Sequence, residues 1–427
     1  MRSSSRNGKR CGSRRSISGI PIGSVGGREA GAIVSAFSGI MGKSHFTMAA
    51  MSLPAELLTW LTSQRNAMVD CLSTWAACES PTSEPERVRA LAQIVASAFT
   101  EAGCDANDHP AALELSLPGR DADASPLLIL GHLDTVYDSG TLERMPVRND
   151  GERLWGPGVY DMKGGIVQLL FALRALAAQG AEPHRPLHIL LVFDEETGSH
   201  ASRSLTEAAA RTAGAAFVLE PAADEDGKLK VARKGIAVYK LSAEGRAAHA
   251  GVDFTEGASA IVELAARVVE IASWSDAARG LTVNPGLFSG GTRLNIVAAH
   301  AEAHIEARAW TAAELAAFDR RIRALEPSDP RVRLALEGGL NRPPMEPTPA
   351  SLALATRARD LGRELGLALE STGTGGGSDG SFTAALGVPT LDGLGAVGAG
   401  AHTYHEHVLI ASLAPRAALL AALLQAI

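Results

Sequence analysis

Two aliphatic runs of the chain end in side chains that can bind a metal ion or move a proton. LILGHLDTV contains His132 and Asp134, and LHILLVFDEE contains Glu195 and Glu196. Apolar β-forming residues followed by polar, reactive side chains are typical of a strand that delivers residues into a cleft. We therefore expect both groups at one edge of a sheet.

Three further residues lie at comparable places. Glu220 ends the aliphatic run AFVLE, Asp161 opens a helix after the glycine-rich GPGVYDMKGG loop, and His402 lies in a late glycine-rich loop, GAGAHTYHE. Open α/β sheets bind ligands at the carboxyl ends of their strands, so groups far apart in sequence can converge there. Histidines and several carboxylates gathered at one edge would repel one another or be neutralised without a cation. The pattern indicates a divalent metal site.

The donors are imidazole and carboxylate without thiolate, which suits zinc and also accommodates cobalt or manganese. One ion needs three or four protein ligands, and with one acid reserved for chemistry five candidates remain: His132, Asp161, Glu196, Glu220 and His402. A carboxylate that bridges two ions ~3.5–4 Å apart uses all five, as in two-metal aminopeptidases. We therefore predict a dinuclear site.

The adjacent acids Glu195 and Glu196 divide the remaining work. Neighbouring side chains after a strand point in different directions, so one can bind metal while the other faces the water. A carboxylate base beside a water whose pKa a metal lowers to about 7 can hydrolyse an amide. We predict that Glu195 is the base and Glu196 a ligand, and that Asp134 orients the imidazole of His132.

Each motif also has a structural interpretation when taken alone. His132 and Asp134 could form a capped turn or a buried pair, DEE could be a solvated loop, and Asp161 could cap a helix. Without a metal site, all of these separate structural roles would have to occur together at the same sheet edge. The pattern therefore favours the metal site. GGGSDG (375–380) matches a dinucleotide fingerprint, but the acid that follows, Asp392, comes too early. We expect instead a loop whose backbone approaches the substrate.

The chain from Pro54 alternates helical and strand patterns, which predicts an α/β fold with a mostly parallel sheet flanked by helices. After Lys234 the order strand, helix, strand, strand, helix, strand predicts an inserted ferredoxin-like α+β unit. The expected domains are a disordered or non-native extension (1–50), the first part of a catalytic domain (51–234), the inserted unit (235–344) and the second catalytic part (345–427).

Composition excludes several other classes of protein. A net charge of −7 gives no basic field for nucleic acid, and no apolar run reaches the ~18 residues of a membrane span. The four cysteines show no metal or disulfide spacing and are expected to be free. The Arg- and Ser-rich start is either an extension or early start codon, or a targeting segment. We expect a cytoplasmic protein, or an exported one if that start is a targeting segment.

Taken together, these motifs resemble those of the zinc-dependent aminoacylase and carboxypeptidase family of metallopeptidases. The family includes glutamate carboxypeptidase, acetylornithine deacetylase and succinyl-diaminopimelate desuccinylase. The resemblance covers roughly Leu53 to Ile427 and rests on GHLDTV, GPGVYDMKGG, FDEETGS, LEP, AAHAGV and AHTYHEH in this order. It implies one zinc on His132, Asp161 and Glu220 and a second on Asp161, Glu196 and His402. Asp161 is then the bridge, Glu195 the base, and Asp134 the acid that orients a histidine.

The resemblance also implies roles for the inserted unit. It would mediate dimerisation and lend His249, in AAHAGV, to the active site of the partner subunit. Asn295 and Arg308 would hold the substrate near its carboxylate, a task suited to a guanidinium fork. Among the histidines of HTYHEH, the family spacing selects His402, four residues before Glu406.

The expected function is release of a C-terminal amino acid, glutamate, from a small peptidyl or N-acyl substrate by a homodimeric amide hydrolase with two zinc ions per subunit. GPG before Asp161 and the short link YDSGTLERMPV resemble the glutamate carboxypeptidase branch. Two alternatives stay open: an N-acyl-amino-acid deacylase of the acetylornithine deacetylase type, and a non-catalytic binding protein on the same fold.

Overall fold

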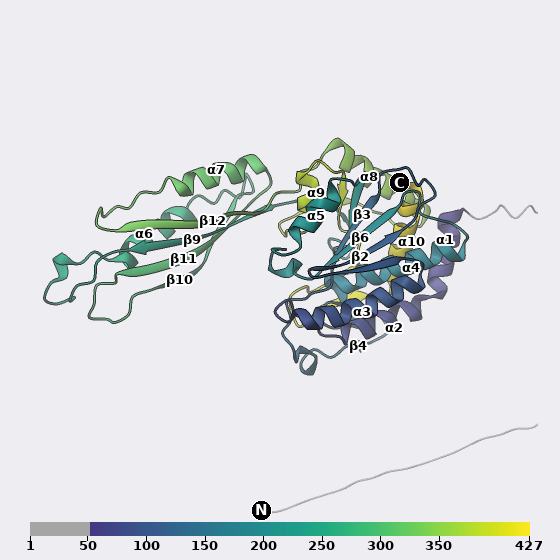
Figure 1. Cartoon of the computed structure of the whole chain (residues 1–427), viewed down its shortest axis with the longest axis horizontal. Coiled ribbons are helices and arrows are strands. Elements are labelled where there is room, and N and C mark those ends of the chain that lie inside the picture. Colours follow the sequence, from purple (N-terminus) through teal and green to yellow (C-terminus); the bar gives the residue numbers. More distant parts are fainter. Residues whose placement is uncertain (1–51) are drawn as a thin grey trace, which may run out of the picture. The chain divides into compact units, whose positions relative to one another are not determined.

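The computed structural model describes residues 52–427, and the predicted N-terminal extension lies outside this part (Figure 1). A six-stranded sheet carries the segments GHLDTV and FDEE at the ends of two of its strands. Its order is β1-β2-β6-β3-β7-β14, and β6, β3, β7 and β14 are parallel, whereas β1 and β2 form an antiparallel edge. The strands are β1 (Asp105–His109), β2 (Ala112–Leu117), β3 (Leu127–His132), β6 (Leu187–Val192), β7 (Ala215–Val218) and β14 (Thr390–Leu391).

Helices cover both faces of this sheet, which confirms the predicted fold class. Figure 1 shows α3 and α4 on one side of the strands and α5 on the other. The helices of this part are α1 (Leu53–Ser63), α2 (Arg65–Ala76), α3 (Pro85–Glu101), α4 (Gly164–Ala178), α5 (Arg203–Ala210), α8 (Pro349–Glu364), α9 (Gly380–Ala385) and α10 (Ile410–Ala426).

Strand β3 shows why its carboxyl end is a rigid platform. Leu127 and Ile129 join the core formed with α1 to α4 and α10, whereas Leu128 and Leu130 join the core beneath α5. All residues of β3 are buried. Full burial of each aliphatic side chain contributes roughly 1.5–3 kcal/mol of hydrophobic free energy, so His132 is carried by a strand anchored on both faces.

Two local predictions were wrong. The helical pattern over residues 55–77 predicts one helix, but the chain bends at Gln64, and the resulting helices α1 and α2 both pack against α4 and α10. Asp161 was expected to open a helix, but it lies in the preceding turn with φ −114° and ψ 96°, and α4 begins at Gly164.

A second, fully antiparallel sheet is formed by residues 235–342. Its order is β10-β11-β9-β12, which with two helices gives the predicted strand, helix, strand, strand, helix, strand sequence. Alternate residues of β9 and β11 form a separate core with both helices. The elements are β9 (Gly235–Glu244), α6 (Ala260–Ala272), β10 (Thr282–Gly290), β11 (His300–Ala309), α7 (Ala312–Arg323) and β12 (Arg333–Arg342).

Two small sheets connect the loops around the first sheet. A parallel pair is formed by β8 (Leu229–Arg233) and β13 (Ser371–Thr374). The other sheet has the order β15-β16-β5-β4 and consists of β15 (Gly398–Ala399), β16 (His407–Leu409), β5 (Arg153–Trp155) and β4 (Arg148–Asn149). It brings the loop of His402 beside the turn that contains Asp161.

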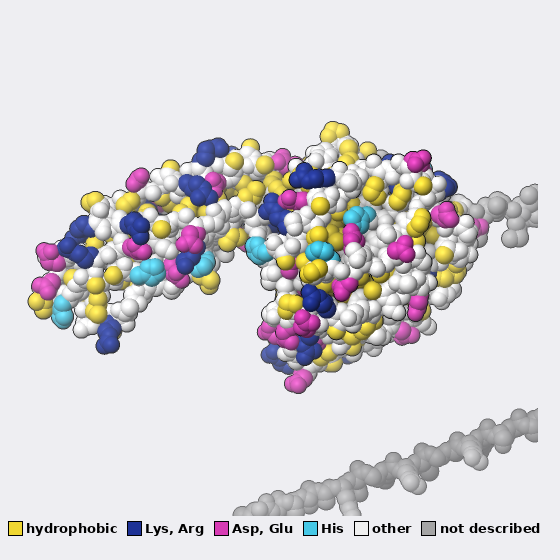
Figure 2. All heavy atoms as spheres, in the orientation of Figure 1, with side chains coloured by type: hydrophobic (Ala, Val, Ile, Leu, Met, Phe, Trp, Pro, Cys, Tyr) yellow, Lys and Arg dark blue, Asp and Glu magenta, His cyan; other side chains and the backbone are white. Residues whose placement is uncertain are grey.

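The distribution of charged side chains on the surface and the state of the cysteines agree with what the composition predicts. Acidic and basic side chains are intermixed on the face drawn in Figure 2. Cys71, Cys78 and Cys104 are free, as predicted. Between residues 52 and 427, each helix is too short or too polar to cross a bilayer.

Candidate metal centre

The five predicted ligands come from separate elements and meet at the carboxyl end of the parallel strands. His132 is the last residue of β3, Glu220 lies two residues after β7, and Glu196 lies in a short turn after β6. Asp161 comes from the turn before α4, and His402 from the loop between β15 and β16.

Asp161 lies at the centre of this cluster. Its Oδ1 is 3.2 Å from Nε2 of His132, and its Oδ2 is 3.4 Å from Nε2 of His402. Each histidine also faces a second carboxylate: His402 Nε2 is 3.1 Å from Glu196 Oε2, and His132 Nε2 is 3.7 Å from Glu220 Oε1. One carboxylate thus separates two imidazoles, each with an acid of its own.

A buried carboxylate, Glu406, fixes the turn of Asp161. It accepts hydrogen bonds from the backbone amides of Tyr160 (2.8 Å), Asp161 (2.9 Å) and Gly158 (3.2 Å), and from the hydroxyl of Tyr137 (2.6 Å). Because Glu406 follows His402 on the same loop, these bonds tie the His402 loop to the Asp161 turn. The four-residue spacing between His402 and Glu406, which selected His402 in the sequence, therefore corresponds to a contact that places the His402 loop beside Asp161.

Asp134 contacts both His132 and the backbone of Glu195 and Glu196. Nδ1 of His132 is 3.0 Å from its backbone carbonyl and 3.4 Å from its Oδ1. Its carboxylate also accepts bonds from the backbone amides of Glu195 (3.3 Å) and Glu196 (3.2 Å), and from the hydroxyl of Thr82 (2.6 Å). Asp134 therefore positions the two tandem acids relative to His132.

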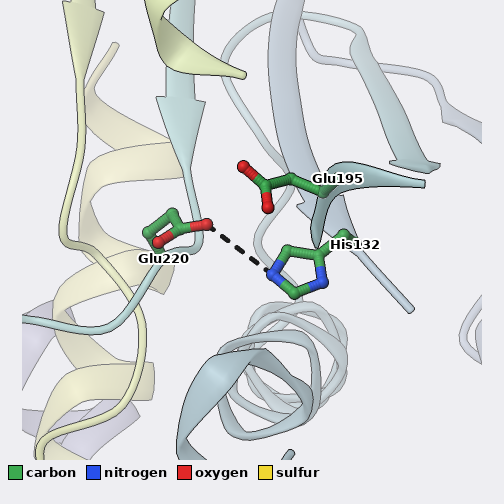
Figure 3. A group of neighbouring side chains, drawn as sticks. All are labelled: His132, Glu195 and Glu220. Atoms are coloured by element: carbon green, nitrogen blue, oxygen red, sulfur yellow. Dashed lines mark ion pairs between the residues drawn. The ribbon is translucent and has the colours of Figure 1, made fainter. Parts of the chain in front are cut away.

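The predicted base, Glu195, enters the cluster from its own side. Figure 3 shows Glu195 and Glu220 reaching toward His132 from different elements. One ligand atom from each of the three residues lies within 4.8 Å of the others. Oε1 of Glu195 is 3.0 Å from Nη2 of Arg342, which also donates to the Glu195 carbonyl at 2.8 Å. A guanidinium thus holds Glu195 beside the cluster.

The pKa values of these residues are shifted because negative charge is buried in excess at the cluster. Burial raises the pKa of Glu195 well above its usual range, and burial together with Asp161 raises the pKa of Glu220 to about 7. Hydrogen bonds to Asp161 and Glu196 raise the pKa of His402 to about 11. Burial opposes protonation of His132, yet Asp134 and Asp161 raise its pKa well above the usual range.

A divalent cation would balance this buried negative charge with ligand types that zinc accepts, neutral imidazole and carboxylate. The donor set therefore fits a metal centre.

The cluster opens into a cavity of about 650 Å³. Arg308 lines it and donates to the Gly375 carbonyl at 2.8 Å. Gly376 and Gly377 of the predicted glycine-rich loop line it as well. The predicted substrate residues His249 and Asn295 are exposed, lie on adjacent stretches of the inserted segment, and are not part of this cavity.

Two buried arginines complete the site, and the sequence does not single them out. Arg233 binds Asp392 through two bonds of 2.7 and 2.8 Å and Glu220 Oε2 at 3.2 Å. Arg342 pairs with Asp379 as well as Glu195. LKVARKG and NRPPME give no local signal for them, because their partners are far away in sequence.

Comparisons with known proteins identify the family. Residues 128–426 match the sequence model described as Peptidase family M20/M25/M40. The chain belongs to this family. It is 31% identical to carboxypeptidase G2 of Pseudomonas sp. (strain RS-16) over 305 residues, 69% of this chain and 72% of that protein. It is 27% identical to succinyl-diaminopimelate desuccinylase of Delftia acidovorans over 319 residues, 70% of this chain and 80% of that protein.

The solved structure of aminopeptidase PepT from Bacillus cereus shares the fold, with a TM-score of 0.71 and 23% identity over 84% of this chain and 98% of that one. Membership of the peptidase family confirms the resemblance predicted from the motifs and makes the chain a metallopeptidase-type hydrolase of small peptide or amide substrates. It also implies a metal cofactor, for which the cluster around Asp161 offers candidate ligands.

Proposed function

We propose that this family member is a dinuclear zinc hydrolase that releases a C-terminal glutamate from a peptidyl or N-acyl substrate. The observation that carries the dinuclear part is the position of Asp161, whose two oxygens face His132 and His402 separately. Release of glutamate is supported by the glutamate carboxypeptidase-like motifs around Asp161 and by the cationic side chains that line the cavity.

The two ions would be held by His132, Asp161 and Glu220, and by Asp161, Glu196 and His402. When bound, zinc supplies Lewis-acid chemistry, polarising the scissile carbonyl and lowering the pKa of water. Both sets contain one imidazole and two carboxylates, which leaves coordination positions for substrate and water.

Glu195 performs the proton transfers of the reaction. Its carboxylate takes a proton from the water that attacks the carbonyl carbon, and returns it to the leaving nitrogen as the C–N bond breaks. Burial raises the pKa of Glu195 above its usual range, in the direction that makes this carboxylate a stronger base. Arg342 holds the carboxylate in place, and Asp134 holds its backbone.

Arg308 provides the contact for the carboxylate of the leaving amino acid. Its guanidinium lines the cavity and is held by Glu306 at 2.7 Å and by the Gly375 carbonyl. A planar guanidinium suits bidentate recognition of a carboxylate. We propose that Asn295 also helps to hold the substrate near its carboxylate, and that His249 acts in the active site of a partner subunit.

A homodimer is supported by the apolar surface of residues 235–344, which we propose to be an inserted dimerisation domain. Val262 and Val269 on α6 and Leu287 on β10 are strongly exposed. Strand β10 is an edge strand of its sheet. Exposed apolar side chains beside an unpaired strand edge favour association with a second copy.

A second candidate is an N-acyl-amino-acid deacylase of the acetylornithine deacetylase type. It is favoured by the similarity to the desuccinylase, whose name describes removal of an acyl group from an amino acid. Both candidates use the same metal ligands and the same base, and they differ in the amine that leaves and the acyl group that stays.

The test is a substrate panel on zinc-reconstituted protein, with elemental analysis of the same sample. Cleavage of N-acyl-glutamates and folate in preference to acetylornithine supports the proposal. The reverse preference assigns the second candidate, and a protein with two bound ions that cleaves none of these amides contradicts both.

A further inference from the structure

Four lysine or arginine side chains line the cavity: Lys230, Arg233, Arg308 and Arg342. The three arginines each have a carboxylate partner within ion-pair distance, namely Asp392, Glu306 and Asp379. These partners hold the guanidinium groups in fixed positions. Lys230 differs from all three.

The ammonium group of Lys230 has no such partner. Within residues 52–427, neither a hydrogen-bond acceptor nor a carboxylate within 4.0 Å holds its Nζ. Lys230 is nevertheless only 9% exposed. Its stem is buried, but its Nζ is not among the side-chain nitrogens cut off from solvent, so the ammonium faces the cavity that Lys230 lines.

The nearby acids are already engaged. Both oxygens of Asp392 accept bonds from Arg233, and one also accepts from Ser378 at 2.7 Å. Glu220 pairs with Arg233 and faces His132. A cation bound by Glu220 would neutralise the negative charge of this carboxylate. Glu220 would then balance less of the positive charge of Lys230. An anion bound in the cavity would therefore meet an ammonium that these acids leave without a direct partner.

The backbone holds Lys230 firmly in this position. It lies in β8, and its amide and carbonyl bond to those of Asp392 at 2.9 and 3.1 Å. Strand β8 also pairs with β13, which leads into the glycine-rich loop at the cavity wall. The ammonium is thus carried by a fixed strand that is separate from the segment carrying Arg308.

We propose that Lys230 determines specificity by binding a second carboxylate of the substrate, in addition to the one held by Arg308. This inference rests on the proposed function, because it assumes that an amide substrate occupies the cavity. The second carboxylate belongs either to the side chain of the released residue, as in an N-acyl-glutamate, or to the acyl group, as in an N-succinyl amino acid. Both present the same anion to the ammonium.

The experiment compares substrates that differ only in one carboxylate. N-benzoyl-glutamate is paired with N-benzoyl-glutamine, and N-succinyl-norvaline with N-succinamoyl-norvaline. The variants are Lys230→Met, Lys230→Arg, which keeps the charge, and Lys228→Met as a matched control. Lys228 lies just before β8, pairs with Asp224 at 2.8 Å and does not line the cavity.

We expect the wild-type protein to favour the carboxylate member of one pair. Lys230→Met should lower kcat/KM for that member by about 10- to 100-fold, the usual worth of a hydrogen bond to a charged group, chiefly through KM. The carboxamide member should change less than about threefold, Lys230→Arg should recover part of the loss, and Lys228→Met should leave both members unchanged. The pair that responds identifies the source of the carboxylate.

Three results would overturn the inference: equal losses on both members of a pair, no loss on either, or loss of bound zinc from Lys230→Met. Binding separates this inference from the proposed function. If no amide is cleaved, dissociation constants of the same four compounds are measured by calorimetry on zinc-loaded Glu195→Gln protein with and without Lys230→Met. A carboxylate preference that disappears with Lys230 supports the contact even then, and an unchanged preference refutes it.

Discussion

The hydroxyl of Thr82 donates a 2.6 Å hydrogen bond to Oδ2 of Asp134 and so joins the segment before α3 to the end of β3. The same carboxylate accepts the backbone amides of Glu195 and Glu196. One buried anion therefore collects three donors from two segments, and its fixed position governs the tandem acids as well as His132. Thr82 contacts none of the reacting groups, so its effect would be one of positioning.

Replacing Thr82 by valine should test this arrangement, because valine keeps the shape of threonine and removes the donor. Loss of a hydrogen bond to a buried carboxylate should lower the free energy of unfolding by about 1.5–3 kcal/mol, measured by urea denaturation. We also expect kcat/KM to fall several-fold with zinc content unchanged. Thr82→Ser keeps the hydroxyl and should behave like the wild type, and a valine variant of full stability and activity would refute the role.

Glu195→Gln should abolish turnover without loss of metal. Glutamine keeps the size of the side chain and can still contact Arg342, but it cannot accept a proton from water. A positioned general base contributes about 10²–10⁴ in rate, so kcat should fall by at least that range. The matched change in the next residue, Glu196→Gln, should instead reduce zinc content, measured by elemental analysis, and substantial activity in Glu195→Gln would remove this residue from the mechanism.

The number of zinc ions bound per chain should depend on the two proposed sets of ligands separately. Zinc-loaded wild-type protein should contain two ions per chain, and His402→Ala should contain one, because His402 belongs only to the set with Glu196. A ligand that binds only the folded state stabilises it by about 2.7 kcal/mol at a hundredfold excess over Kd. The chelated protein should therefore melt at a lower temperature than the zinc-loaded one. A single ion in the wild type would leave Asp161 without a bridging role.

The parts of the site that could be predicted from the sequence are those with a local signal. His132 and Glu196 each come at or just after the end of a short aliphatic run rich in β-formers, which is typical of a buried strand, so their place at the sheet edge followed from the pattern. Thr82, Arg233 and Arg342 carry no such signal, because an isolated threonine or arginine acquires its meaning from a partner that only the fold brings near.

Short elements were missed for a similar reason. Strands β4 and β15 contain two residues each, fewer than a periodic pattern needs. The bend at Gln64 was missed because α1 and α2 both keep an apolar face, and both pack against α4 and α10, which only the fold brings near.

The exposed apolar side chains of the inserted segment should mediate dimerisation. Val269 on α6 is 71% exposed and Leu287 on β10 is 65% exposed. Replacing either by glutamate places a charge in the proposed interface, and we expect the dimer to dissociate in light-scattering measurements while zinc stays bound. Ile94→Glu on α3 is the matched control, since Ile94 is an exposed apolar residue outside this segment.

If His249 acts in the partner's cavity, subunits with different defects should complement each other. Neither Glu195→Gln nor His249→Ala should be active alone. In a mixed dimer, the site that keeps Glu195 would receive His249 from the other subunit, so refolding an equal mixture should restore about a quarter of the wild-type sites by random pairing. Glu195→Gln mixed with Leu287→Glu carrying His249→Ala should restore none, because the interface is lost. Recovery that fails in the first mixture while dimers form would place the action of His249 within its own subunit, or outside catalysis.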